Sequence, residues 1–225
     1  MSKETLHLLL RMNHDRLETQ IALQCAPLLI GVKISNLLPV ASDRKQEAEG
    51  LFEGTAVSCY MLYESGEKTT FLLYLRSGLT EYLAKEDVKR LMERFGYHAM
   101  KLERILERVS EKYTSYMDGT GGRVNIHSRH PAERNFHTYP SGFPHEIGLL
   151  LGYPPADVLG FIRNNGQNYL CTGYWKVYSN QSECKRIFRG YSQARERLIY
   201  MVSHGMGIGD ILKIHGLHQY KSITI

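Results

Sequence analysis

Two runs rich in β-branched and aromatic residues, separated by a short turn, constrain the fold of this chain more than any other feature. The runs are Thr55 to Tyr63 and Lys68 to Arg76, and Glu64 to Glu67 lie between them. This arrangement is typical of a β-hairpin. The segments that follow, Thr80 to Phe95 and Met100 to Tyr116, carry apolar side chains at helical spacing. The order predicts an antiparallel sheet covered by amphipathic helices.

The N-terminal quarter is predicted to contain one helix and one strand. Apolar residues at helical spacing predict a helix over Lys3 to Gln24. Cys25-Ala26-Pro27 should end this helix, because the residue before a proline avoids the α-helical region. Leu28 to Leu38 is dense in Leu, Ile and Val, which favours a buried strand or extended segment. The charged stretch from Pro39 to Gly54 is predicted to be an exposed loop that could include one helical turn.

The region after Tyr139 combines turn residues with short apolar stretches. Pro155 suits a first helical position, and Asn-Gly suits a turn with positive φ. The expected elements are a helix over Pro144 to Leu151, a helix over Pro155 to Arg163, a turn at Asn164 to Gly166, a strand over Tyr169 to Tyr178, a helix ending near Val202, a helical turn at Ile208 to Ile214 and an edge strand at Ser222 to Ile225.

These elements predict an α+β fold in which a small, mainly antiparallel sheet packs against several amphipathic helices. The hairpin, the Leu28 segment and the Tyr169 strand should form the sheet, and helix should exceed strand. We expect one domain over residues 1–225. Residues 118–140 are rich in glycine and proline and poor in aliphatic side chains, so they are predicted to form a flexible excursion.

Composition narrows the class of protein. The 225 residues have a formal charge of +5 with the basic residues dispersed, so we do not expect nucleic-acid binding. The apolar runs are too short or too interrupted to span a bilayer. Four cysteines without a CxxC pair, and no recognisable signal peptide, favour free thiols in a soluble, cytoplasmic protein.

Three residues are candidates for catalysis. Cys25 could serve as a nucleophile if a nearby cation lowered its pKa and a histidine lay within reach; the alternative is a small buried hydrophobe. His145 could act as a general base with Glu146 as its partner. Alternatively, both are first-turn residues, with the carboxylate favoured there by the helix dipole.

Three cations lie in or beside apolar, strand-like runs and are candidates for binding an anion. Lys33, Arg76 and Lys176 would each need a carboxylate or an anionic ligand if buried, whereas strand alternation or snorkelling would leave them in solvent. Trp175 adjoins Lys176 and could line a pocket with the neighbouring tyrosines, or belong to the core. Histidines 127, 130 and 137 match no closed zinc pattern, so no metal site is predicted, and the sequence leaves any cofactor unknown.

Several motifs resemble the bacterial family catalogued as domain of unknown function 3793. They are Phe143-Pro144-His145-Glu146-Ile147-Gly148, Leu151-Gly152-Tyr153-Pro154, Asp157 to Ile162, Gly173-Tyr174-Trp175-Lys176-Val177-Tyr178, and Cys25-Ala26-Pro27 with Gly31, Lys33, Asn36 and Leu37. The resemblance implies that Cys25, Lys33, Asn36, Arg76, His145, Glu146, Trp175 and Lys176 belong to the family's pattern. It establishes no activity, and it suggests an iron or redox context.

Two classes of function remain open from the sequence. One is an enzyme centred on a cysteine or a histidine, and the other is a non-catalytic binding or adaptor module for a small, possibly anionic, molecule or a protein. We expect Cys25, Lys33, His145 and Trp175 to converge on one concave site, because each is hard to explain separately by packing.

Overall fold

The predicted hairpin forms two of the three strands of the main sheet. In the computed structural model, which describes residues 2–120 and 142–217, β2 (Val57–Glu64) pairs antiparallel with β3 (Lys68–Leu75). The strand β1 (Ser35–Ala41) pairs antiparallel with the other edge of β3, so the order is β1-β3-β2. The α+β fold is confirmed.

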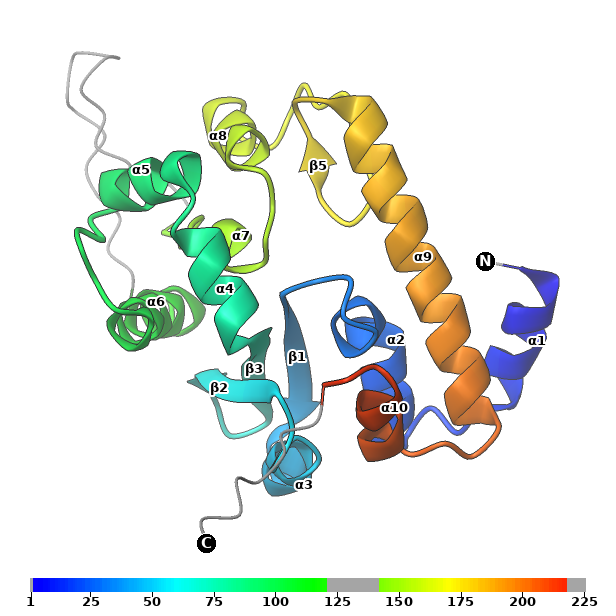
Figure 1. Ribbon diagram of the computed structural model, residues 1–225. Coiled ribbons are helices and arrows are strands. Elements are labelled where there is room, and N and C mark those ends of the chain that lie inside the picture. The colour runs from blue at the N-terminus through cyan, green and yellow to red at the C-terminus, as the bar shows by residue number, and fades with distance from the viewer. Residues whose placement is uncertain (1, 121–141, 218–225) are drawn as a thin grey trace, which may run out of the picture.

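Helices cover both faces of this sheet (Figure 1). They are α1 (Lys3–Arg11), α2 (Leu17–Leu29), α3 (Lys45–Gly50), α4 (Arg76–Leu83), α5 (Glu86–Arg94), α6 (Leu102–Met117), α7 (Ile147–Leu150), α8 (Pro155–Arg163), α9 (Gln181–Ser203) and α10 (Ile208–Ile214), with a 3-10 turn η1 (Ser42–Arg44). Among the described helices, none has both the length and the apolar character needed to cross a membrane.

The central strand β3 is buried on both faces, because its side chains alternate between two apolar clusters. Leu72 and Tyr74 pack into a cluster with α4 to α8. Phe71 and Leu73 pack into a second cluster with α2, α3, α10 and the C-terminal part of α9. A third, smaller cluster joins the start of α9 to the segment around Trp175.

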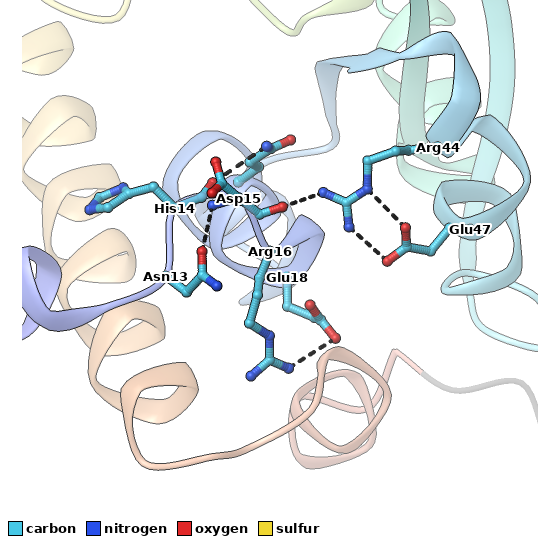
Figure 2. A network of polar contacts seen from close by, with 8 residues as sticks. Asn13, His14, Asp15, Arg16, Glu18, Arg44 and Glu47 are labelled. Carbon is cyan, nitrogen blue, oxygen red and sulfur yellow. Dashed lines mark hydrogen bonds and ion pairs between the residues drawn. The ribbon is translucent and has the colours of Figure 1, made fainter.

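The N-terminal helix is shorter than predicted, because the chain breaks between α1 and α2. The side chain of Asn13 accepts a hydrogen bond from the backbone N–H of Asp15 at 2.9 Å, which stabilises a turn there. A guanidinium group holds this turn against η1: Arg44 donates to the Asp15 carbonyl and makes two 2.9 Å bonds to Glu47 (Figure 2). Local polar contacts therefore interrupt the apolar stripe.

The prediction that Cys25-Ala26-Pro27 ends the helix is wrong. The helix α2 passes through Pro27 and ends at Leu29, and a left-handed Gly31 (φ +77°) follows. The Val32 N–H bonds to the Pro27 carbonyl and the Gly31 N–H bonds to the Leu28 carbonyl, which is a Schellman ending. The first part of the expected Leu28 to Leu38 strand is consequently helix, and Lys33 lies in the tight connection to β1.

The predicted strand over Tyr169 to Tyr178 is also wrong. It is replaced by a small hairpin of β4 (Cys171–Thr172) and β5 (Lys176–Val177), which is separate from the main sheet. Gly173 lies in the turn, where a Cβ atom would approach the Phe188 ring to 2.3 Å. The bend is therefore needed to pack this segment on α9.

Some of the remaining predicted helices are confirmed, and others are corrected. The helices over Met100 to Tyr116 and Pro155 to Arg163 are confirmed within two residues, as are those at the C-terminal end. Thr80 to Phe95 is two helices, since Lys85 has extended backbone angles. The helix predicted at Pro144 is only the four-residue α7. The Ser222 to Ile225 strand and most of the excursion lie outside the described residues.

Candidate functional site

A cavity of about 430 Å³ lies between α7, α8 and the β4–β5 hairpin. Its lining is mainly apolar and aromatic, which is typical of pockets for small molecules. The lining residues are Leu37, Phe143, His145, Ile147, Gly148, Leu151, Tyr153, Asp157, Val158, Phe161, Thr172, Gly173, Tyr174, Trp175 and Lys176. Three of the sequence candidates, His145, Trp175 and Lys176, are therefore brought together.

Trp175 is buried and forms part of the cavity lining. Its indole stacks on the ring of Tyr153, with centroids 4.9 Å apart and planes inclined by 28°. Phe188 of α9 packs against the indole edge-on, at a centroid distance of 4.5 Å. The indole N–H donates to Asp157 Oδ2 at 2.8 Å. These contacts hold Trp175 in one orientation.

Asp157, at the start of α8, is a residue that sequence reasoning missed. It is only 2% exposed. One carboxylate oxygen accepts hydrogen bonds from the backbone N–H groups of Tyr178 and Ser179, each at 2.8 Å, and from the Ser179 hydroxyl at 2.9 Å. Because the other oxygen holds Trp175, this carboxylate ties α8 to the hairpin and to the start of α9.

Two basic residues, His145 and Lys176, line the cavity. Burial lowers the pKa of His145 below its usual value, so its imidazole is neutral at neutral pH. The centroid of its ring lies 5.5 Å from that of Phe143 and 5.6 Å from that of Phe161. Lys176 Nζ donates to the Gly166 carbonyl at 2.8 Å. It lies 5.7 Å from the Phe161 ring centroid and 5.1 Å from that of Tyr169.

Glu146 does not point into the cavity with its neighbour His145. Its buried carboxylate faces α6, where it pairs with Lys112 at 2.6 Å and accepts a 2.9 Å hydrogen bond from the Tyr97 hydroxyl. The two residues therefore point in different directions, as adjacent residues at a helix start do. Glu146 anchors the segment that carries His145.

Cys25 and Lys33, which are buried, form a separate cluster with the half-buried Asn36 near the end of α2. Lys33 Nζ donates to Asn36 Oδ1 at 2.8 Å, and Asn36 Nδ2 lies 3.5 Å from Cys25 Sγ. Burial raises the pKa of the Cys25 thiol to about 12, despite the opposing effects of Asn36 and Lys33. A nucleophilic thiolate needs the opposite shift.

Lys33 is the residue through which this cluster approaches the cavity. It is 7% exposed, and its Nζ lies 5.6 Å from the ring centroid of Tyr153 and 5.9 Å from that of Tyr191. Desolvation lowers the pKa of Lys33 to about 8. Tyr153 thus has Trp175 as one neighbour and the Lys33 ammonium as another.

Arg76 lies elsewhere, at the first residue of α4 rather than in a strand. It is exposed and pairs with Glu103, at a hollow of about 580 Å³ between α4, α5 and α6. Its neighbours there include Lys89 and Lys101. The structure therefore does not bring Arg76 to the cavity.

The expected convergence of four residues is met only in part. His145 and Trp175 line one cavity, whereas Cys25 and Lys33 are not among the residues that line it. Tyr153, which the sequence candidates did not include, connects the two groups. The sequence signal that could have identified Tyr153 was its place in the Leu151-Gly152-Tyr153-Pro154 motif that resembles the family.

Across residues 2–120 and 142–217, no His, Cys, Asp and Glu side chains gather in a group that could hold a metal. Histidines 127, 130 and 137 lie outside these ranges.

Comparison with known proteins gives a family and no activity. Searches against curated proteins and against solved structures found no match. A family model described as "Protein of unknown function (DUF3793)" matches residues 21–212, which include every candidate site residue named above. The chain therefore belongs to this family of proteins of unknown function, DUF3793.

Proposed function

We propose that the protein is a binding module for a small, flat, aromatic anion that occupies the cavity between α7, α8 and the β4–β5 hairpin. The observation that carries the proposal is the lining, which combines aromatic rings with one lysine. Of the two classes of function that the sequence left open, the proposal adopts the non-catalytic binding module and specifies its ligand. It does not adopt the enzyme.

The aromatic lining suits a planar ligand. The rings of Phe143, Tyr153, Phe161, Tyr174 and Trp175 all border the cavity. Offset stacking and edge-on packing of a ligand ring against such surfaces add to the free energy of burial. A volume of about 430 Å³ lies within the range of small-molecule pockets.

The polar groups favour a negatively charged ligand. Lys176 has an acceptor in the Gly166 carbonyl, and an ammonium has two further N–H donors to offer. Asp157, the acidic residue in the lining, already receives five hydrogen bonds, one of them from the Cys184 thiol.

The same lining favours binding over covalent catalysis. It contains no cysteine and no serine among the described residues, and Cys25 lies in another cluster with a raised pKa. The four free cysteines support our proposal that the protein works in a reducing compartment such as the cytoplasm.

A matched pair of dyes tests the proposal. 1-Anilinonaphthalene-8-sulfonate is a planar aromatic anion, and N-phenyl-1-naphthylamine has the same rings without the sulfonate. Trp175 is the only tryptophan, so energy transfer from it to a dye reports binding close to the cavity. We expect both dyes to bind the native protein, the anion more tightly.

Two variants connect the binding to the cavity. Lys176→Gln should lower the affinity for the sulfonate about tenfold, the effect of one charge-assisted hydrogen bond, and leave the neutral dye nearly unchanged. Thr172→Phe, at an exposed position of the lining, should weaken both dyes by filling the cavity. Lys185→Gln, on the exposed side of α9, is the matched control. Absence of energy transfer from Trp175 to either dye would refute the proposal.

A further inference from the structure

Lys33 combines deep burial with a lack of acidic partners. Its side chain is 7% exposed, and no carboxylate among residues 2–120 and 142–217 forms an ion pair with it. One hydrogen bond, to Asn36 Oδ1, satisfies one of its three donors. Burying a cation with so little compensation is destabilising, and this favours a functional reason for its presence.

The position of Lys33 suggests that reason. The ammonium lies 5.6 Å from the centroid of Tyr153, whose ring lines the proposed ligand cavity. A ligand atom in contact with that ring is within about 10 Å of the charge, since van der Waals contact adds about 4 Å. The Tyr153 ring lies between them, and a charge is screened less through an aromatic ring than through water.

We propose that Lys33 is a specificity-determining residue for the cavity: its buried ammonium, which has no carboxylate partner among the described residues, attracts the ligand's negative charge through the Tyr153 ring without touching the ligand. The inference rests on the proposed function. Two lysines would then attract the ligand. Lys176 lines the cavity, whereas Lys33 lies behind the lining.

The size of the effect follows from Coulomb's law. Two unit charges about 10 Å apart at an effective dielectric constant of about 20 change a binding constant by roughly tenfold. Since burial lowers the pKa of Lys33 to about 8, this attraction should be lost in mildly alkaline solution. A neutral ligand should show no such loss.

The other titratable groups around Lys33 keep one charge state over this range. Burial raises the pKa values of Cys25 and Tyr191 to about 12, and it also raises that of Tyr153 above its usual value. On the cavity side, the pKa of His145 is lowered, so its imidazole is already neutral. Asp157 and Lys176 are the remaining charged groups in the lining, and a Lys176 variant controls for the second.

The experiment measures the affinity of both naphthalene dyes from about pH 7 to about pH 9.5, a range in which the sulfonate keeps its charge. In the native protein, the affinity for the anionic dye should fall about tenfold, and that for the neutral dye should stay constant. Lys33→Met should bind the anion about tenfold more weakly at about pH 7 and show no dependence on pH. Lys33→Arg should keep the higher affinity throughout, because a guanidinium does not lose its proton.

Lys176→Gln and Lys185→Met separate the alternatives. Lys176→Gln should bind the anion more weakly but keep the dependence on pH, and Lys185→Met should behave as the native protein. If the anion affinity falls with pH equally in Lys33→Met, or does not fall in the native protein while both dyes bind, the role of Lys33 is refuted and the proposed function stands. If neither dye binds the native protein, the proposed function itself fails.

Discussion

The indole of Trp175 donates a 2.8 Å hydrogen bond to Asp157, and this buried contact connects the β4–β5 hairpin to α8. Through it, α8 is tied to the β4–β5 hairpin, and the same carboxylate receives the backbone N–H groups that begin the approach to α9. Asp157 therefore holds α8 against the hairpin, and both of these elements border the cavity.

Asp157→Ala should destabilise the protein strongly. The change leaves the indole N–H and two backbone N–H groups buried without acceptors, so we expect a loss of about 3 to 5 kcal/mol in the free energy of unfolding. Urea denaturation followed by circular dichroism measures it. Asp210→Ala, which breaks the exposed pair with Lys213, should change stability by about 0.5 kcal/mol or less. Similar losses in both variants would show that Asp157 does not hold the hairpin.

Lys33 should make stability depend on pH in the alkaline range. Its pKa falls from 10.5 to about 8 on folding, so the unfolded chain binds more protons between these values, and stability should rise with pH there. The full shift corresponds to a folded-state cost on the order of 3 kcal/mol below about pH 8. Lys33→Met should therefore be more stable than the native protein at neutral pH and should lose this slope. A less stable Lys33→Met protein with an unchanged slope would contradict the assignment.

The cysteines should react with iodoacetamide in an order set by burial. Cys25 is fully buried, and burial raises its pKa and that of Cys59 to about 12 and that of Cys184 to about 11. Cys171 is partly exposed on β4, so it should be labelled first in the native protein. Mass spectrometry of tryptic peptides over time gives the order. Labelling of Cys25 ahead of Cys171 would restore the enzyme hypothesis.

Two glycine substitutions should have opposite effects. At Gly173, an added Cβ would meet the Phe188 ring at 2.3 Å, and Phe188 is held by Trp175, so Gly173→Ala should cost about 1 to 3 kcal/mol. At Gly190, inside α9, an added Cβ meets nothing within 4 Å. Gly190→Ala should stabilise the helix by about 0.5 to 1 kcal/mol. Thermal unfolding of both variants checks the pair, and a neutral Gly173→Ala would mean that Phe188 moves freely.

We predict that the chain unfolds as one domain. The central strand is shared by two apolar clusters, through Leu72 on one face and Phe71 on the other, so neither cluster keeps its packing without the sheet. Trp175 fluorescence reports the third cluster and circular dichroism reports the helices, and the two urea transitions should coincide. Separate midpoints would divide the chain into two domains.

The sequence by itself determined the elements whose signals are local. The hairpin turn at Ser65 and Gly66, the helical spacing in α6, α8 and α9, and the family to which residues 21–212 belong all follow from neighbouring residues. The sequence placed Cys25 and Lys33 in one site with His145 and Trp175, whereas the structure places them with Asn36 in a cluster of their own.

Only the tertiary structure decided which face each candidate side chain takes. Pro27 lies inside α2, which ends two residues later in a Schellman motif, so the first part of the apolar run after it is helix and only its end is strand. Arg76 and Glu146 turn away from the cavity toward partners on α6, which no local pattern encodes. Long-range packing overrides the local conformational preference where a buried polar side chain finds a hydrogen-bond or ion-pair partner on another element. For this reason the spacing of residues in the sequence could not identify the site.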